Sequence, residues 1–85
     1  MPETRNYTIK GDPEEMLRGL KGALPSLATL SGDSTRGNIM APLFGTIISF
    51  SRTGDQLNVT VHRSVLGYTV PQIWGMIERG LGRFL

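Results

Sequence analysis

Apolar and polar residues alternate along two neighbouring segments of the chain, within residues 44–63. Between the two segments, Gly54 and Asp55 form a two-residue connection of the kind that closes a tight antiparallel hairpin. The register set by this turn pairs Thr53 with Gln56, Phe50 with Val59, and Ile48 with Val61. Apolar side chains then share one face, and the other face holds Ser49, Ser51, Asn58 and Thr60. The pattern therefore predicts a half-buried hairpin, because a shift of one residue would expose the apolar set.

The N-terminal part of the chain predicts a strand followed by a helix. Residues 5–10 alternate between polar and apolar side chains, which is typical of a short strand. Asp12 is the expected N-cap, with Pro13 at the first helical position and Glu15 placed to complete a capping box. Apolar residues then recur at helical spacing, at Met16, Leu17, Leu20 and Leu24. Pro25 ends the predicted helix.

A second helix is predicted near the C-terminus. Thr69 and Gln72 have the spacing of a capping box. The apolar stripe that follows consists of Ile73, Ile77, Leu81 and Phe84. Glycines at 75, 80 and 82 oppose this helix on propensity, each by about 1 kcal/mol relative to alanine. Packing against the rest of the protein must therefore hold it.

The segment between the first helix and the hairpin leaves alternatives open. The residues from Leu27 to Leu30 are too few to separate a strand from an extended loop. Residues 32–38 are rich in turn-forming side chains and predict an exposed loop. The apolar run from Ile39 to Leu43 contains Pro42, which has no amide hydrogen, so this run fits a sheet edge or a bulge better than a sheet centre.

These elements predict a single α+β domain over residues 1–85, in the order β-α-β-β-β-α. An antiparallel sheet of three to four strands is expected to carry both helices on its apolar face, in two layers. That face is expected to include Ile48, Phe50, Leu57, Val59 and Val61. The opposite face is expected to meet water.

Composition narrows the class of protein. The chain is 39% apolar and 19% charged, as in ordinary globular proteins. It has no cysteine, which excludes disulfides, thiolate metal sites and cysteine nucleophiles. No apolar run approaches the ~20 residues of a membrane span, so the expected location is cytoplasmic. The net charge of +2 is spread along the chain and indicates no strong nucleic-acid affinity.

Candidate catalytic groups are sparse, so we expect no enzyme, no metal and no cofactor. Gly32, Asp33 and Ser34 spell the nucleophile block of one group of serine esterases. However, His62 is the only histidine, and no carboxylate is expected beside it. A solvated turn is the simpler interpretation of the block. Arg36, in the same glycine-containing segment, is a candidate anion contact.

The final helix offers the best candidate for an interaction surface. Its apolar residues extend beyond one narrow stripe and include Trp74, Met76, Phe84 and Leu85. Trp74 either completes the core or marks an apolar patch that binds a partner. Gly75 and Gly80 would let another backbone come close.

From about Thr29 onward, the sequence combines Gly45 before an alternating strand, the turn at Gly54, a second alternating strand and a closing apolar helix. In these elements the chain resembles the polyhydroxyalkanoic acid system (granule-associated region) family of small bacterial proteins. The resemblance implies a bacterial protein and supplies no active-site motif. The final helix carries fewer charges here than is typical of that family.

Two functions are expected. The first is a non-enzymatic module that presents an apolar surface around the C-terminal helix, to a second copy or to another protein. The second is a carrier of a small hydrophobic ligand or lipid, with a pocket of at least ~300 Å³ between sheet and helices, lined by Phe44, Phe50 and Trp74.

Overall fold

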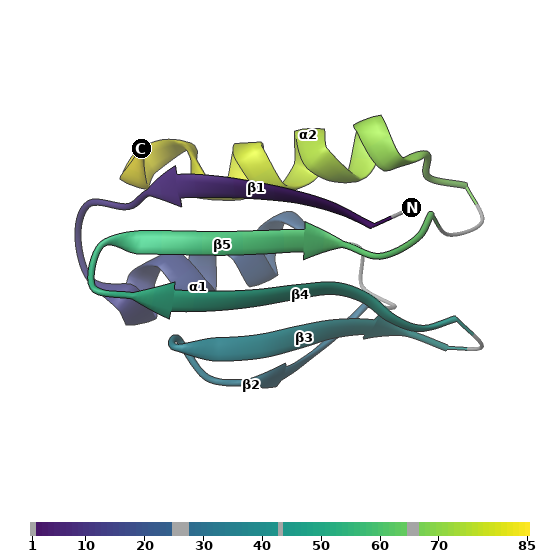
Figure 1. The fold of residues 1–85 in the computed structure, drawn as a ribbon, viewed down its shortest axis with the longest axis horizontal. Helices are drawn as coiled ribbons and strands as arrows, with labels where there is room; N and C mark the ends of the chain where they lie inside the picture. The colour runs from purple at the N-terminus through teal and green to yellow at the C-terminus, as the bar shows by residue number, and fades with distance from the viewer. Residues whose placement is uncertain (1, 25–27, 43, 65–66) are drawn as a thin grey trace.

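Five antiparallel strands form one sheet in the order β1-β5-β4-β3-β2. The structure, a computed structural model, describes residues 2–24, 28–42, 44–64 and 67–85 (Figure 1). Along the chain, the elements are β1 (Glu3–Thr8), α1 (Pro13–Ala23), β2 (Thr29–Gly32), β3 (Arg36–Ala41), β4 (Gly45–Thr53), β5 (Gln56–Val61), α2 (Val70–Leu81) and a short 3₁₀ helix, η1 (Gly82–Phe84).

The predicted hairpin is confirmed as β4 and β5. Its observed register pairs Thr53 with Gln56, Phe50 with Val59, and Ile48 with Val61. Gly54 has a φ of 61°, the left-handed conformation that a two-residue hairpin connection needs. The turn and the two apolar patterns agree, which explains why local sequence is sufficient to determine this pairing.

The predicted number of strands is wrong, because the sheet has five strands and not three or four. Both segments that the sequence leaves open contribute a strand, since β2 includes Thr29 and Leu30 and β3 includes residues 39–41, and both strands extend into the segment expected to be a loop. Gly32 ends β2 and Arg36 begins β3, so only residues 33–35 form the turn between these strands. Gly37 resembles a loop residue in the sequence, yet it lies in β3 because the ring of Phe50 occupies the space that a Cβ would take.

The apolar run around Pro42 contains the irregularity expected from it. Ile39 pairs with Ile48, whereas Met40 pairs with Thr46, which leaves Ile47 as an extra residue in β4. This bulge explains how the neighbours Ile47 and Ile48 are both buried. β3 is nevertheless an interior strand, and it ends immediately before Pro42. Pro25, Leu27 and Leu43, on which sequence expectations also fell, lie outside the described residues.

β1 completes the sheet by pairing with β5, the strand most distant from it in sequence. The remaining neighbours in the sheet are also neighbours along the chain. In Figure 1 the strands lie in front of α1, and α2 runs along the β1 side of the sheet. The view is therefore onto the face that no helix covers.

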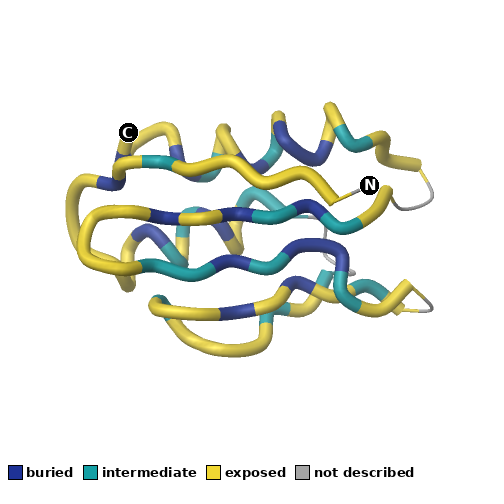
Figure 2. The backbone as a smooth tube through the Cα atoms, in the orientation of Figure 1, coloured by how far each residue is buried: buried dark blue, intermediate teal, exposed yellow. Residues whose placement is uncertain are grey.

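Both helices pack on the other face and form the second layer. One core cluster joins apolar residues of the two helices to those of the sheet, and the burial pattern along β4 and β5 follows the predicted alternation (Figure 2). The five residues expected on the inner face are all buried: Ile48, Phe50, Leu57, Val59 and Val61. The two-layer arrangement is the one that lets a sheet with one apolar face exclude water.

The helix ends follow the sequence signals in part. The side chain of Asp12 accepts a hydrogen bond from the Glu14 amide at 2.9 Å, but within the described residues Glu15 does not return the bond of a capping box. At α2, Thr69 and Gln72 form both bonds of the predicted box. The helices cross where Gly19 meets Gly80, since a Cβ on Gly19 would lie 2.9 Å from the Gly80 carbonyl oxygen.

Candidate functional site

The apolar surface expected around α2 is mostly core. Trp74 and Phe84 are 2% and 8% exposed, and both belong to the main hydrophobic cluster. Met76 is partly buried against the same cluster, and Leu85 is 47% exposed. Gly80 approaches another backbone, but that backbone is α1 of the same chain. The four predicted surface residues therefore do not form one exposed patch, and the available surface is reduced to Met76 and Leu85.

A polar network from β1 covers Trp74. The Arg5 guanidinium lies 4.5 Å from the centre of the Trp74 ring, and it donates a 3.1 Å hydrogen bond to Glu78. Tyr7 donates to the same Glu78 oxygen at 2.9 Å. Burial and this bond to Glu78 raise the pKa of the Tyr7 phenol. The network joins β1 to α2. The Arg5 guanidinium shields the Trp74 ring from water. The indole Nε1 is buried and has no hydrogen-bond partner among the described residues.

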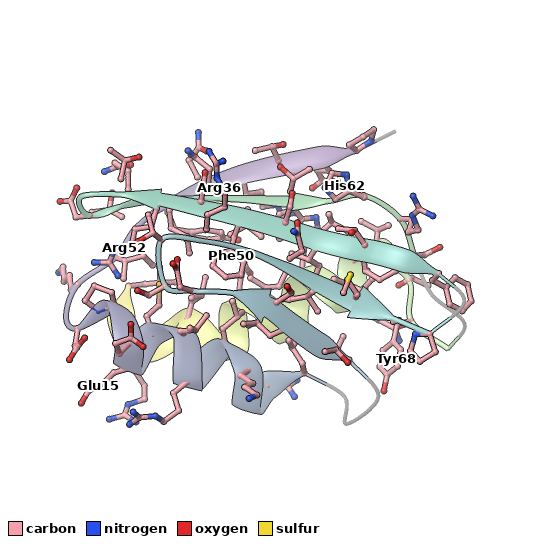
Figure 3. All side chains as sticks on the ribbon, turned by 90° about the horizontal axis from the view of Figure 1, so that it is seen from below. Glu15, Arg36, Phe50, Arg52, His62 and Tyr68 are labelled. Atoms are coloured by element: carbon pink, nitrogen blue, oxygen red, sulfur yellow. The ribbon has the colours of Figure 1, made fainter. Side chains whose placement is uncertain are left out.

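The segment around Arg36 contains a turn whose amides bond a carboxylate of the chain itself. One carboxylate oxygen of Asp33 accepts hydrogen bonds from the amides of Thr35 and Arg36, at 2.8 and 3.1 Å. These two backbone bonds lower the pKa of Asp33. The turn thus satisfies its own amides with a side chain. The Arg36 side chain lies on β3, facing away from the helices (Figure 3), and it forms no ion pair within the described parts of the chain. An anion contact by Arg36 stays a prediction.

The esterase-like block does not assemble a catalytic group. The Ser34 hydroxyl donates to Glu14 on α1 at 3.1 Å. The only histidine instead bonds a different serine, since Ser49 Oγ and His62 Nε2 are 2.7 Å apart. The sequence pattern predicts Ser49 on the outer face but does not predict this contact, which is diagonal across the β4–β5 pair. No carboxylate among the described residues bonds this pair, so a nucleophile with an oriented base is not built here.

Two kinds of site are absent from residues 2–24, 28–42, 44–64 and 67–85: a metal-binding cluster and a membrane-spanning helix. In that part of the chain, no cluster of three or more histidine, cysteine, aspartate or glutamate side chains has the geometry to hold a metal ion. None of the described helices is long and apolar enough to cross a membrane.

An open, mostly apolar hollow lies at one end of the molecule, beside the start of α2. Its volume is about 600 Å³. Two aromatic side chains on its rim are exposed, Phe44 at 37% and Tyr68 at 36%, and Figure 3 shows Tyr68 at this end of the molecule. Arg63 donates a 3.0 Å hydrogen bond to the Phe44 carbonyl, which places a cation beside the rim. The described lining residues are Phe44, Ser64, Gly67, Tyr68, Thr69, Val70 and Gln72.

The position of this hollow corrects the pocket expected from the sequence. Of the three expected lining residues, only Phe44 lines it, while Phe50 and Trp74 are 3% and 2% exposed in the core. A smaller hollow of about 230 Å³ lies where α1 meets η1, with Glu15, Arg18 and Arg83 on its rim. The space between sheet and helices is occupied by side chains of the core cluster.

The outer face of the sheet is polar and nearly free of charge. The sequence has nine basic and seven acidic residues, yet Arg36 is the only one of them among the outward-facing strand residues, all of which are described. Cross-strand bonds join Thr4 to Thr60 at 2.9 Å and Gln56 to Thr8 at 3.1 Å. The other outward strand residues are Asn6, Thr29, Ser31, Arg36, Asn38, Met40, Thr46, Ser49, Ser51, Thr53 and Asn58.

The fold and these surfaces define a small α+β domain with an open antiparallel sheet and an aromatic hollow. Comparisons with models of known families, with characterised proteins and with solved structures gave no match. The resemblance to the polyhydroxyalkanoic acid system family therefore stays a prediction.

Proposed function

We propose that this protein is a non-enzymatic binding module that holds a small amphiphile in the aromatic hollow between Phe44 and Tyr68. The ligand has an apolar ring or chain and one acidic head group. The observation that carries this proposal is the exposure of both aromatic rings around a mostly apolar hollow of about 600 Å³. Exposed rings gathered in a concave site are unusual unless something covers them.

The size and chemistry of the hollow favour a small molecule. Sites for small ligands typically have volumes of about 300–1,000 Å³, with apolar walls and a few polar groups that fix orientation. Here Phe44, Tyr68 and Val70 provide the apolar wall. Arg63, fixed against the Phe44 carbonyl, provides a cation for the head group. This hollow replaces the expected surface along α2, because Trp74 and Phe84 are enclosed in the core.

Binding of anilinonaphthalene sulfonate, followed by its fluorescence and by calorimetry, tests the proposal. This probe has apolar rings and one anionic group, and decanoate is the aliphatic counterpart. We expect saturable binding that Phe44→Ala and Tyr68→Ala each weaken by about tenfold, since each truncation removes a ring from the wall. Arg63→Gln should weaken binding of both probes less strongly, because it removes only the charge beside the head group.

Leu85→Ala is the matched control, because Leu85 is also an exposed large apolar residue but lies at the opposite end of the molecule. It should leave the affinity unchanged. Far-ultraviolet circular dichroism of each variant shows that the fold is retained. Absence of saturable binding by the wild type, or an equal loss in Leu85→Ala, would overturn the proposal.

A further inference from the structure

We propose that two copies of this chain associate through the outer faces of their sheets, with the strands of one copy packed over those of the other. This inference does not depend on the amphiphile site, which lies at one end of the molecule and not on that face. The partner is a second copy because of the chemistry of the face, its freedom from helices and its area.

The chemistry of the face is self-complementary. Nearly all outward-facing side chains are hydroxyls or amides, and these groups both donate and accept hydrogen bonds. An identical face can therefore satisfy them in more than one relative position. A face rich in one sign of charge would instead repel its own copy, but here Arg36 is the only charged residue among the outward-facing strand residues. Depletion of charged side chains is one compositional feature of interface centres.

The charge-poor face contrasts with the rest of the surface. The solvent-facing side of an antiparallel sheet is commonly polar, and charged side chains, lysine above all, protect exposed strands at sheet edges against association. In this protein those residues lie elsewhere: on the helices, in the turns and on the helix side of β1, where Glu3 and Arg5 are found. The outer side of β4, the central strand, carries Ser49, Ser51 and Thr53.

The area of the face fits a weak dimer. Five strands at about 4.8 Å spacing and about six residues of 3.3 Å each give a face of about 24 by 20 Å, or about 500 Å² per copy. The total of about 1,000 Å² is at the lower limit for a specific interface. Twisted sheets pack face to face at about 10 Å separation with their strands nearly aligned. We therefore expect a dissociation constant on the order of 100 µM.

A lysine introduced on the outer face is the substitution that should weaken the proposed dimer most specifically. Because the outward strand residues of the partner include no acid, a lysine near the middle of the face has no anion opposite it when the two faces are centred on each other, whereas an added acid could pair with Arg36. Asn58 lies between Asn6 and Ser51 near the middle of the sheet. Asn58→Lys should leave the monomer folded, because the side chain faces solvent there. In the dimer, each copy brings one lysine into the interface.

Sedimentation equilibrium from about 10 µM to about 1 mM measures the association. We expect a monomer–dimer equilibrium that Asn58→Lys weakens by at least about tenfold, because charges without partners are costly in an interface. Gly22→Lys adds the same charge on α1, where no atom lies within 4 Å of an added Cβ, and should leave the dimer intact. Asn58→Ser keeps a side chain that donates and accepts hydrogen bonds, so it should also leave the dimer intact.

A label gives an independent readout, because the chain has no cysteine. A spin label on Ser51→Cys should report a short distance between copies, since Ser51 faces outward on β4. The same label on Gly22→Cys, on α1 in the helix layer, should report a longer one. A protein that is monomeric at about 1 mM, or a dimer that Asn58→Lys leaves intact, would overturn the proposal. Either outcome would leave the amphiphile site untouched, as its variants test a different surface.

Discussion

The two faces of the sheet are built from the same strands, but the inner face packs against the helices and the outer face meets solvent. On the inner face, Phe50 and Val59 pair under two helices, and side chains fill the space completely enough to leave them 3% and 0% exposed. On the outer face, Ser51 and Asn58 pair in the same strands with no helix above them. The inner face fixes the fold through shape. The outer face contributes little to stability, so its composition is free to serve binding.

The largest expected difference between the faces comes from adjacent residues of β4. Phe50→Ala should lower the free energy of unfolding by about 3–5 kcal/mol, because it removes a buried ring and leaves a cavity. Ser51→Ala should change it by less than about 0.5 kcal/mol. Urea denaturation measures both. If Phe50→Ala is unfolded, Phe50→Leu provides the intermediate case. Similar losses at the two positions would show that the outer face is also packed.

This contrast also explains which parts of the fold the sequence predicts. The β4–β5 register and the capping box at Thr69 are local, since each is determined by residues within one hairpin or one turn of helix. The first half of β3, residues 36–38, was predicted as a loop because Gly37 favours a loop by itself. Its place in the strand depends on the ring of Phe50, which only the paired sheet brings there. The pairing of β1 with β5 is likewise invisible to local pattern, because the two strands are far apart in sequence.

The candidate surfaces also divide into those that local sequence predicts and those that depend on contacts between distant residues. The width of the apolar stripe in α2 suggested an exposed patch around Trp74. In the structure, Arg5 and the β1–α2 network enclose that residue, and no spacing rule connects position 5 with position 74. The hollow between Phe44 and Tyr68 is also formed by distant segments. The uncharged outer side of β4 and β5, by contrast, could be predicted from the hairpin pattern alone.

Packing within the helix layer should be sensitive to a single methyl group. A Cβ on Gly19 would lie 2.9 Å from the Gly80 carbonyl oxygen, so Gly19→Ala should lower the free energy of unfolding by about 1–3 kcal/mol. Gly22→Ala is the matched control in the same helix. No atom lies within 4 Å of its added Cβ, and the better helix propensity of alanine should raise stability by about 0.5–1 kcal/mol. Opposite signs in thermal denaturation support the observed crossing, and a gain in both variants contradicts it.

A smaller effect is expected where β1 covers the inner layer. Arg5→Ala removes the guanidinium over Trp74, so water should reach the indole ring and shift its fluorescence to longer wavelength. Because Trp74 is the only tryptophan, the emission reports this site alone. Arg5→Lys keeps the charge but not the planar group that stacks on the ring, and should give an intermediate shift. An unchanged spectrum in Arg5→Ala would mean that the core shields Trp74 without help from β1.

The smallest effect concerns the turn that connects β2 and β3, at the margin of both faces. The Asp33 carboxylate has a lowered pKa in the folded protein because the amides of Thr35 and Arg36 donate to it. A lowered pKa stabilises the fold above the ordinary pKa of the group, and this stability is lost as pH falls through the folded value. Wild type should therefore exceed Asp33→Asn in urea midpoint at about pH 7, and the two should converge near about pH 2. Asp55→Asn, in the β4–β5 turn, controls for the loss of one negative charge. A difference that is independent of pH would show that Asp33 acts through its shape alone.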